Sequence, residues 1–296
     1  MNDLYRDIKA VLTEGGIIEG EAKAIALMLM EKVCGITTTE VLMNHPKGEA
    51  YRTELLAMSQ RIAQGEPVQY VLGEADFCGM SMKVQPGVLI PRKETEELVA
   101  WIVEEGRGKK EALHVLDIGT GSGCIAVALA KTLEGAEVEA WDVSDVALQT
   151  AKENAERNSV IVETKKVDVL MDNTQRLRVG ELCSGIRTTD YGVFDVIVSN
   201  PPYICEEEKA EMERNVLEHE PPLALFVPDN DPLLFYRRIG ELGLSILRGK
   251  GLLFFEINRR FGKEVVKLLQ DMGYQDVELR QDQFDNDRMV KAIKPQ

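Results

Sequence analysis

The spacing of apolar residues changes along the chain and predicts two kinds of structure. Residues 1 to about 72 show helical spacing throughout, as in "EAKAIALMLMEKVCG" and "AYRTELLAMSQRIAQG". Gly35 and Gly65 close these two segments and are expected to end helices there, because glycine readily adopts the left-handed conformation that follows a helix. The sequence therefore predicts an N-terminal helical domain over residues 1–72.

A second pattern begins after residues 73–93, where short β-like runs punctuated by glycine and proline predict a β-hairpin linker. From Glu94 onward, short apolar runs alternate with helical segments, which is typical of a parallel sheet covered by helices on both faces. We expect residues 94–296 to form an α/β domain with a doubly wound, mostly parallel seven-stranded sheet. The expected strands are residues 114–119, 137–143, 163–169, 194–199, 251–257, 276–284 and 288–294, of which the last two can pair antiparallel. The polar stretch 172–192 is expected to be a surface loop.

The composition of the chain argues against several classes of function. The 296 residues carry a formal net charge of -15, so the overall field repels phosphate backbones and argues against direct, non-specific nucleic-acid binding. The chain contains neither the apolar run of a signal peptide nor 18 consecutive apolar residues, so we expect a soluble cytoplasmic protein without membrane contact. Its five cysteines form no Cys-x-x-Cys pair and its three histidines lie far apart, which makes metal chemistry an unfavourable interpretation.

The stretch "VLDIGTGSGC" places three glycines at the turn from the first parallel strand into its helix. Such a turn can be no more than a tight bend that requires positive φ. Asp142, however, closes the next strand 23 positions after Gly119, about where a carboxylate would bind the two hydroxyls of a ribose. The candidate cofactor-binding residues are Asp117, Gly119, Thr120, Gly121, Ser122, Gly123 and Asp142.

The spacing of the glycines bears on which cofactor they would bind. A dinucleotide fingerprint requires glycine at position 124, where this chain has Cys124, and the third glycine comes one residue early. S-adenosylmethionine fits better, because it needs close backbone approach and ribose recognition but carries no pyrophosphate. A purely structural role for Asp142, as a carboxylate that only caps a helix, stays open at this point.

The stretch "VSNPPYIC" follows what reads as a buried strand, and its two prolines end that strand and stiffen the turn. If the strand lies beside the first one, the turn faces the glycine loop across the point where the strand order reverses. Asn200 and the Pro201 carbonyl then supply two acceptors for the N–H groups of a planar amide, which direct the nitrogen lone pair towards a methyl donor. Pro202 fixes the turn and Tyr203 supplies a flat wall.

Four stretches together, "PVQYVLGEADF", "VLIPRKETEELV", "DIGTGSG" and "VSNPPYI", resemble the bacterial release-factor glutamine methyltransferases, the PrmC/HemK family, over nearly the whole chain. The resemblance implies a class I methyltransferase fold that is Rossmann-like. It also implies S-adenosylmethionine as cofactor. The implied substrate is the glutamine of the Gly-Gly-Gln loop of class 1 peptide-chain release factors, methylated on its side-chain amide nitrogen, with the N-terminal domain recognising the factor.

The resemblance also assigns residues. It implies that Asn200, Pro201, Pro202 and Tyr203 bind the glutamine. Asn200 would also contact the cofactor, and Asp168 and Val169 would lie where the family contacts the adenine. Phe77 and Arg92 would border the substrate pocket, with plain packing or a surface ion pair as the alternatives. The segment from Glu220 to Pro222 resembles a mobile family loop or forms a structural turn.

This chain departs from the family pattern in loops, most clearly at Lys93, where a proline is usual. Three other functions stay open on the sequence alone: a glutamine methyltransferase of a ribosomal protein, an adenine-N6 nucleic-acid methyltransferase, and a non-catalytic cofactor-binding module.

Overall fold

The computed structural model describes residues 3–43, 46–107, 111–171 and 193–296, so the predicted surface loop at 172–192 lies outside the described residues. The chain folds into two compact units. One comprises residues 1–74 with Glu213–His219, and the other comprises residues 75–212 with 220–296. No helix in the described ranges is long and apolar enough to cross a membrane.

The first unit is built from amphipathic helices. On its first helix Leu4, Ile8 and Leu12 recur every four residues and are fully buried, which is the spacing that places side chains on one helical face. Gly35 ends the second helix with φ 60°, and its N–H donates to Glu31 O at 2.9 Å, as the sequence predicted. The helices are α1 (Asp3–Glu14), α2 (Glu19–Cys34), α3 (Thr38–Leu42), the 3-10 helix η1 (Pro46–Tyr51), α4 (Arg52–Ala63) and α5 (Val68–Leu72), and α10 (Arg214–His219) groups with them.

Two short paired strands follow, β1 (Glu74–Phe77) and β2 (Met80–Lys83), of which only Glu74 belongs to the first unit. The second unit continues in alternating strands and helices. The main strands are β3 (His114–Ile118), β4 (Glu137–Asp142), β5 (Glu163–Lys166), β6 (Phe194–Ser199), β9 (Leu247–Glu256), β10 (Gln275–Gln281) and β11 (Asp287–Ile293). The helices are α6 (Lys93–Gly106), α7 (Cys124–Thr132), α8 (Asp145–Arg157), α11 (Pro222–Leu225), α12 (Leu234–Ile246), α13 (Gly262–Asp271) and the 3-10 helix η3 (Glu206–Glu211). Two short strands, β7 (Ile204–Cys205) and β8 (Phe226–Val227), pair with each other.

The strand order of the main sheet is β10-β11-β9-β6-β3-β4-β5. The neighbours from β9 through β5 are parallel, and β11 runs antiparallel to both β9 and β10. The prediction of a seven-stranded, mostly parallel sheet is confirmed, as is the antiparallel pairing of the last two strands. The strand β9 begins at Leu247, four residues earlier than the apolar run that predicts it.

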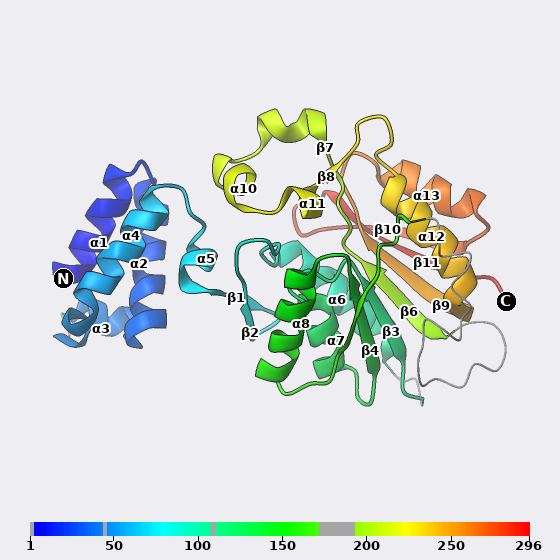
Figure 1. Ribbon diagram of the computed structural model, residues 1–296, viewed down its shortest axis with the longest axis horizontal. Coiled ribbons are helices and arrows are strands. Elements are labelled where there is room, and N and C mark those ends of the chain that lie inside the picture. The colour runs from blue at the N-terminus through cyan, green and yellow to red at the C-terminus, as the bar shows by residue number, and fades with distance from the viewer. Residues whose placement is uncertain (1–2, 44–45, 108–110, 172–192) are drawn as a thin grey trace. The chain divides into compact units, whose positions relative to one another are not determined.

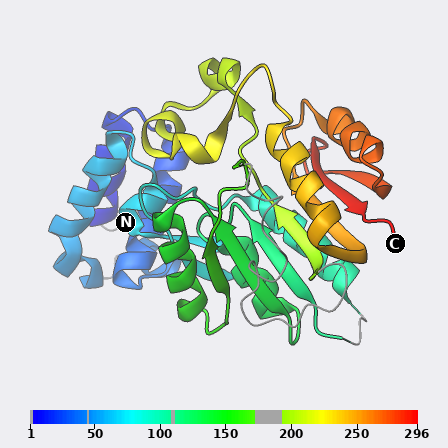
Figure 2. The ribbon, with the colours of Figure 1, turned by 45° about the vertical axis from the view of Figure 1, so that its right-hand side comes forward.

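Helices cover both faces of this sheet. Val196 and Val198 of β6 lie in a core with residues of α6 and α7, whereas the intervening Ile197 lies in a second core with residues of α12 and α13. This alternation follows from the two-residue period of a strand. Figure 1 shows α6, α7 and α8 on one side of the strands and α12 and α13 on the other, and the turned view of Figure 2 keeps these two groups apart.

The strand order reverses between β3 and β6, because the chain passes from β3 outward to β5 and returns on the other side of β3. In this pair Ile118 lies opposite Ser199, and the Ser199 hydroxyl donates to Ile118 O at 2.7 Å. The glycine loop and the Asn-Pro-Pro turn therefore leave the sheet side by side. Crevices at such reversal points bind ligands in open α/β sheets.

Candidate functional site

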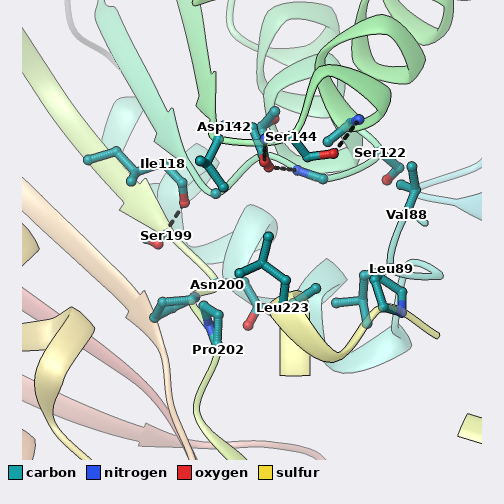
Figure 3. A pocket seen from close by; sticks show the side chains of 18 of the residues that line it. Val88, Leu89, Ile118, Ser122, Asp142, Ser144, Ser199, Asn200, Pro202 and Leu223 are labelled. Atoms are coloured by element: carbon teal, nitrogen blue, oxygen red, sulfur yellow. Dashed lines mark hydrogen bonds between the residues drawn. The ribbon is translucent and has the colours of Figure 1, made fainter. Parts of the chain in front are cut away.

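A cavity of about 270 Å³ opens at this reversal point. Figure 3 shows Asn200 and Pro202 along one side, Ser122 and Val88 across from them, and Asp142 and Ser144 along a third edge. The sequence-predicted residues that line it are Arg92, Gly119, Thr120, Gly121, Ser122, Asp142, Asp168, Val169, Asn200, Pro201 and Pro202. Phe77, Asp117, Gly123 and Tyr203 are not among the lining residues.

The glycine loop is fastened to the neighbouring strand by its backbone. The N–H groups of Gly119 and Thr120 both donate to Trp141 O, at 2.8 and 3.0 Å. Gly119 and Gly121 have φ values of 72° and 55°, and a Cβ at either would meet no atom within 4 Å. Their missing side chains thus leave open space at the cavity, as a closely approaching ligand requires.

Gly123 differs from the other two glycines. A Cβ there would come within 2.7 Å of Ala151 Cβ on α8, so this glycine allows the start of α7 to pack tightly against α8. Its φ of 78° also favours glycine. Gly123 therefore shapes the loop from below, without lining the cavity.

Asp142 joins the loop to the next helix. Its Oδ2 accepts from Gly121 N and its Oδ1 accepts from Ser144 N, both at 2.9 Å. Burial raises the pKa of Asp142, and these backbone donors oppose the rise by stabilising the charged form. Each oxygen keeps a further lone pair, so the carboxylate can accept from a ligand without releasing the loop.

Asp117 lies beneath the loop and is fully buried. Its Oδ2 accepts a hydrogen bond of 2.6 Å from Thr120 Oγ1, so it orients a residue that does line the cavity. Burial raises the pKa of Asp117 to about 7, because the charged form loses solvation there.

At the end of β5 the chain turns beneath the cavity. Asp168 Oδ1 accepts from Leu170 N at 2.9 Å, and this local bond shapes the turn. Val169 is buried, and its carbonyl accepts from Arg238 Nε at 2.9 Å. The sequence analysis did not single out Arg238, because nothing in a helical arginine indicates a partner 69 positions away.

Side-chain contacts hold the turn after β6, among them a hydrogen bond of 3.0 Å from Asn258 Nδ2 to Tyr203 O. Asn200 Nδ2 donates to Thr95 Oγ1 over a long 3.4 Å. The Tyr203 hydroxyl donates to Oε1 of the buried Glu256 at 3.1 Å, and its ring packs against the core on the α12 side. The predicted contact between the Tyr203 ring and a substrate amide stays a prediction.

The two hairpin-region candidates occupy different surroundings. Phe77 is fully buried in the core shared with α6 and α7. Arg92 lines the cavity and also donates to Oε1 of Glu220 at 2.6 Å, so it takes part in an ion pair.

Three further residues that sequence reasoning passed over organise the site. Asn154 of α8 is fully buried, and its Nδ2 donates to Lys83 O at 2.9 Å and to Ser122 O at 2.8 Å. It thereby joins the hairpin to the glycine loop, and a polar residue on the apolar face of a helix was the available signal. Thr95 and Glu256 form a buried pair at 2.6 Å whose partners lie 161 positions apart.

Within the described ranges, no group of three or more histidine, cysteine, aspartate or glutamate side chains has an arrangement that could hold a metal ion. The polar groups that line the cavity are instead backbone amides, an amide side chain, hydroxyls, carboxylates and the guanidinium of Arg92. Such a set suits an organic ligand that has both hydroxyl and amide groups.

Two family models match separate parts of the chain. Residues 3–73 match the model described as "PrmC N-terminal domain". Residues 94–201 match the model described as "Ribosomal protein L11 methyltransferase (PrmA)". A solved structure of the hMettl16 catalytic domain in complex with MAT2A 3′UTR hairpin 6 superposes with a TM-score of 0.54 at 20% identity, over 80% of this chain and 81% of that one, which supports the fold alone.

Full-length relatives are closer in sequence. The release factor glutamine methyltransferase of Bacteroides thetaiotaomicron is 44% identical, and the alignment covers 92% of both chains. That of Flavobacterium psychrophilum is 46% identical over 82% of this chain and 79% of its own. With such identity across both units, the chain belongs to the family of release factor glutamine methyltransferases.

Proposed function

We propose that this protein transfers a methyl group from S-adenosylmethionine to the side-chain amide nitrogen of the glutamine in the Gly-Gly-Gln motif of class 1 peptide-chain release factors. The observation that carries the proposal is the pairing of Ile118 with Ser199. It brings the glycine loop and the Asn-Pro-Pro turn to one cavity, in a chain that belongs to this methyltransferase family.

The residues on the β4 side of the cavity fit the cofactor. The open space at Gly119 and Gly121 admits a ligand against the backbone, and Asp142 presents lone pairs to the two hydroxyls of a ribose. Asp168 and Val169 would border the adenine, and Thr120 and Ser122 would complete the wall. When bound, the cofactor supplies an electrophilic methyl group on a positively charged sulfur.

The residues on the β6 side fit the substrate. An amide nitrogen is a poor nucleophile because its lone pair is delocalised into the carbonyl. Asn200 Oδ1 and the Pro201 carbonyl would accept its two N–H groups and hold the lone pair along the path to the methyl group, which is catalysis by orientation. Tyr203 would limit tilting of the amide, and Pro202 would keep the Pro201 carbonyl fixed.

Recognition of the release factor is assigned to the N-terminal helices. We propose that residues 1–72 form the recognition domain, that residues 73–93 link it to catalysis, and that residues 94–296 carry out methyl transfer. Remote contacts to a folded substrate supply binding energy that positions the reacting group. An isolated Gly-Gly-Gln peptide is therefore expected to be a poor substrate.

The function is tested by incubating the purified protein with labelled S-adenosylmethionine and an intact release factor. One methyl group should appear on the Gly-Gly-Gln glutamine, located by mass spectrometry, and a factor with that glutamine replaced by alanine is the control. Ribosomal protein L11 is the second substrate to include, because the catalytic region matches the model named for its methyltransferase. Label confined to L11, RNA or DNA would overturn the proposal.

The division of roles is tested by two variants. Asp142→Ala should weaken cofactor binding by roughly 1.5 to 3 kcal/mol, because two hydroxyls lose a charged acceptor. Asn200→Ala should leave cofactor affinity nearly unchanged while turnover collapses. Calorimetry and initial rates measure the two effects, and the exposed Asp145, which pairs with Lys166, provides Asp145→Ala as a control. The opposite ordering would refute the division.

A further inference from the structure

Glu256 lies at the end of β9 and is 1% exposed. Its Oε2 accepts a hydrogen bond of 2.6 Å from Thr95 Oγ1, and its Oε1 accepts one of 3.1 Å from the Tyr203 hydroxyl. The carboxylate therefore joins the start of α6 to the turn that follows β6. Neither of these contacts is needed to form the sheet, since Glu256 already pairs with Met289 through the backbone.

The Thr95 hydroxyl has a single proton, and this fixes the direction of its hydrogen bonds with Glu256 and Asn200. A hydroxyl has one proton to donate, and the short contact shows that Thr95 donates it to Glu256. The Thr95 oxygen can then only accept, so the Asn200 atom that faces it at 3.4 Å must be the –NH₂ group. The opposite amide orientation would set the Asn200 oxygen against a Thr95 oxygen that has no proton left.

The hydrogen-bond donors around Glu256 support this direction. The pKa of Glu256 is raised, mainly by burial and to a lesser degree by the Glu94 carboxylate, whereas the Thr95 hydroxyl, the Arg288 guanidinium and the Tyr203 hydroxyl favour its charged form. Two hydroxyl donors, one for each oxygen, match a carboxylate, because a protonated acid would place its own proton against one of them.

Asn200 and Thr95 both line the cavity, whereas Glu256 lies behind them. With the –NH₂ group of Asn200 held by Thr95, the other end of the amide is the carbonyl oxygen. We propose that Glu256 and Thr95 are positioning residues that fix the amide orientation of Asn200, so that the site offers an acceptor to the substrate and selects a glutamine amide over a carboxylate. This inference rests on the proposed function.

The selectivity follows from charge and hydrogen-bond direction. A glutamine amide has two N–H donors to meet the Asn200 oxygen, and a glutamate carboxylate has none. A site that holds its acceptor rigidly rejects the wrong ligand through unmatched lone pairs. If the Asn200 amide could turn over freely, its –NH₂ group would meet a carboxylate and most of the discrimination would be lost.

The hydroxyl of Thr95 is tested by a pair of variants. Thr95→Val removes the hydroxyl at nearly constant volume and should lower kcat about 10- to 100-fold with less than about a threefold change in KM for the release factor. Thr95→Ser restores the hydroxyl and should recover most of kcat. Thr150→Val is the matched control, since Thr150 is equally buried, donates to Val146 O and accepts from Gln85, and does not line the cavity.

Glu256→Gln tests the direction of the bonds at almost unchanged shape. The new amide can donate to Thr95, which frees the Thr95 proton for the Asn200 oxygen and favours the reversed orientation. The readout is inhibition by a release factor carrying Gly-Gly-Glu, compared with the affinity for the Gly-Gly-Gln factor. We expect the preference for glutamine to fall at least about fivefold in Glu256→Gln, with cofactor affinity unchanged by calorimetry.

The outcomes separate the two proposals. If the wild-type protein leaves the release factor unmethylated, the proposed function fails and the inference fails with it. If the wild-type protein methylates the factor but Thr95→Val and Glu256→Gln keep both kcat and the preference for glutamine, only the inference is overturned. A fall in melting temperature and activity with an unchanged preference for glutamine would assign the pair to stability alone, which also overturns it.

Discussion

Arg92 Nη2 donates to Glu220 Oε1 over 2.6 Å, although 128 positions separate the two residues. The Glu220 side chain is 1% exposed and that of Arg92 is 36% exposed. The second oxygen of Glu220 accepts from Ile90 N at 3.3 Å. The pair thus fastens the segment before α6 to the segment before α11. The helix α11 contributes Leu223 to the cavity wall (Figure 3), and Ala224 of the same helix also lines the cavity.

Replacing Glu220 should loosen this wall. Glu220→Ala leaves the Ile90 N–H and the Arg92 guanidinium without their acceptor. We expect a loss of roughly 1 kcal/mol in the free energy of unfolding, at the low end of the range for a lost buried partner, because solvent reaches the partly exposed Arg92 side chain. Urea unfolding measures it. Asp271→Ala, which breaks the exposed pair with Lys267, should change stability by less than about 0.5 kcal/mol. Equal losses in the two variants would contradict a structural role for the Arg92–Glu220 pair.

Two glycines of the loop should respond differently to the same substitution. Gly123→Ala combines φ 78° with a contact of 2.7 Å to Ala151 Cβ, so it should cost about 2 to 4 kcal/mol of stability. Gly121→Ala meets no atom within 4 Å at φ 55°, and should cost about 1 to 2 kcal/mol while weakening cofactor binding by filling the cavity. Denaturation and calorimetry on both variants provide the comparison. A larger stability loss in Gly121→Ala would contradict the geometry.

Asp117 should make stability depend on pH. Its pKa of about 7 in the folded protein lies above the ordinary value near 3.9, so folding takes up a proton between these pH values. The contribution of Asp117 to stability is therefore greatest below about pH 4 and is lost as the pH rises towards 7, by up to about 1.4 kcal/mol per pH unit.

The Asp117→Asn variant isolates this effect. Asparagine does not titrate. The free energy of unfolding of the variant, relative to that of the wild type, should therefore rise from pH 4 to 7 and stay constant above pH 7. Thermal or urea unfolding across the range tests it. The exposed pair of Asp145 with Lys166 offers Asp145→Asn as a control, and a flat difference for Asp117→Asn would refute the prediction.

Two substitutions of Tyr203 distinguish the role of its ring from the role of its hydroxyl. Tyr203→Phe keeps the ring and removes one donor to Glu256, which retains Thr95. Methylation should stay within roughly tenfold of the wild type, whereas Tyr203→Ala should lose far more because the opened space lets the substrate amide tilt. Rates and melting temperatures should be compared with Tyr274→Phe, which removes a buried hydroxyl bonded to Gly240 O. Equal losses in the Phe and Ala variants of Tyr203 would assign the role to its hydroxyl.

The pattern of the chain predicted the sheet well because the relevant interactions are local. The two-residue alternation around Val196 and the glycines at the turn after Ile118 depend on backbone geometry and on burial of both sheet faces. The positions of Asn200 and Asp142 at strand ends followed from the same pattern. The start of β9 was misjudged, because the polar residues from Arg248 to Lys250 hide a strand that begins at Leu247.

The sequence by itself determined the order of strands and helices, the glycine loop and the Asn-Pro-Pro turn, because each is encoded by neighbouring residues. Other features were decided only by the tertiary structure. The structure alone decided that Glu256 meets Thr95, that Arg92 meets Glu220, and that Asp117 and Tyr203 are not among the residues that line the cavity. These pairings join residues more than a hundred positions apart, or depend on which way a side chain turns at a strand end. Such choices depend on close packing of the whole unit, and no local pattern specifies them.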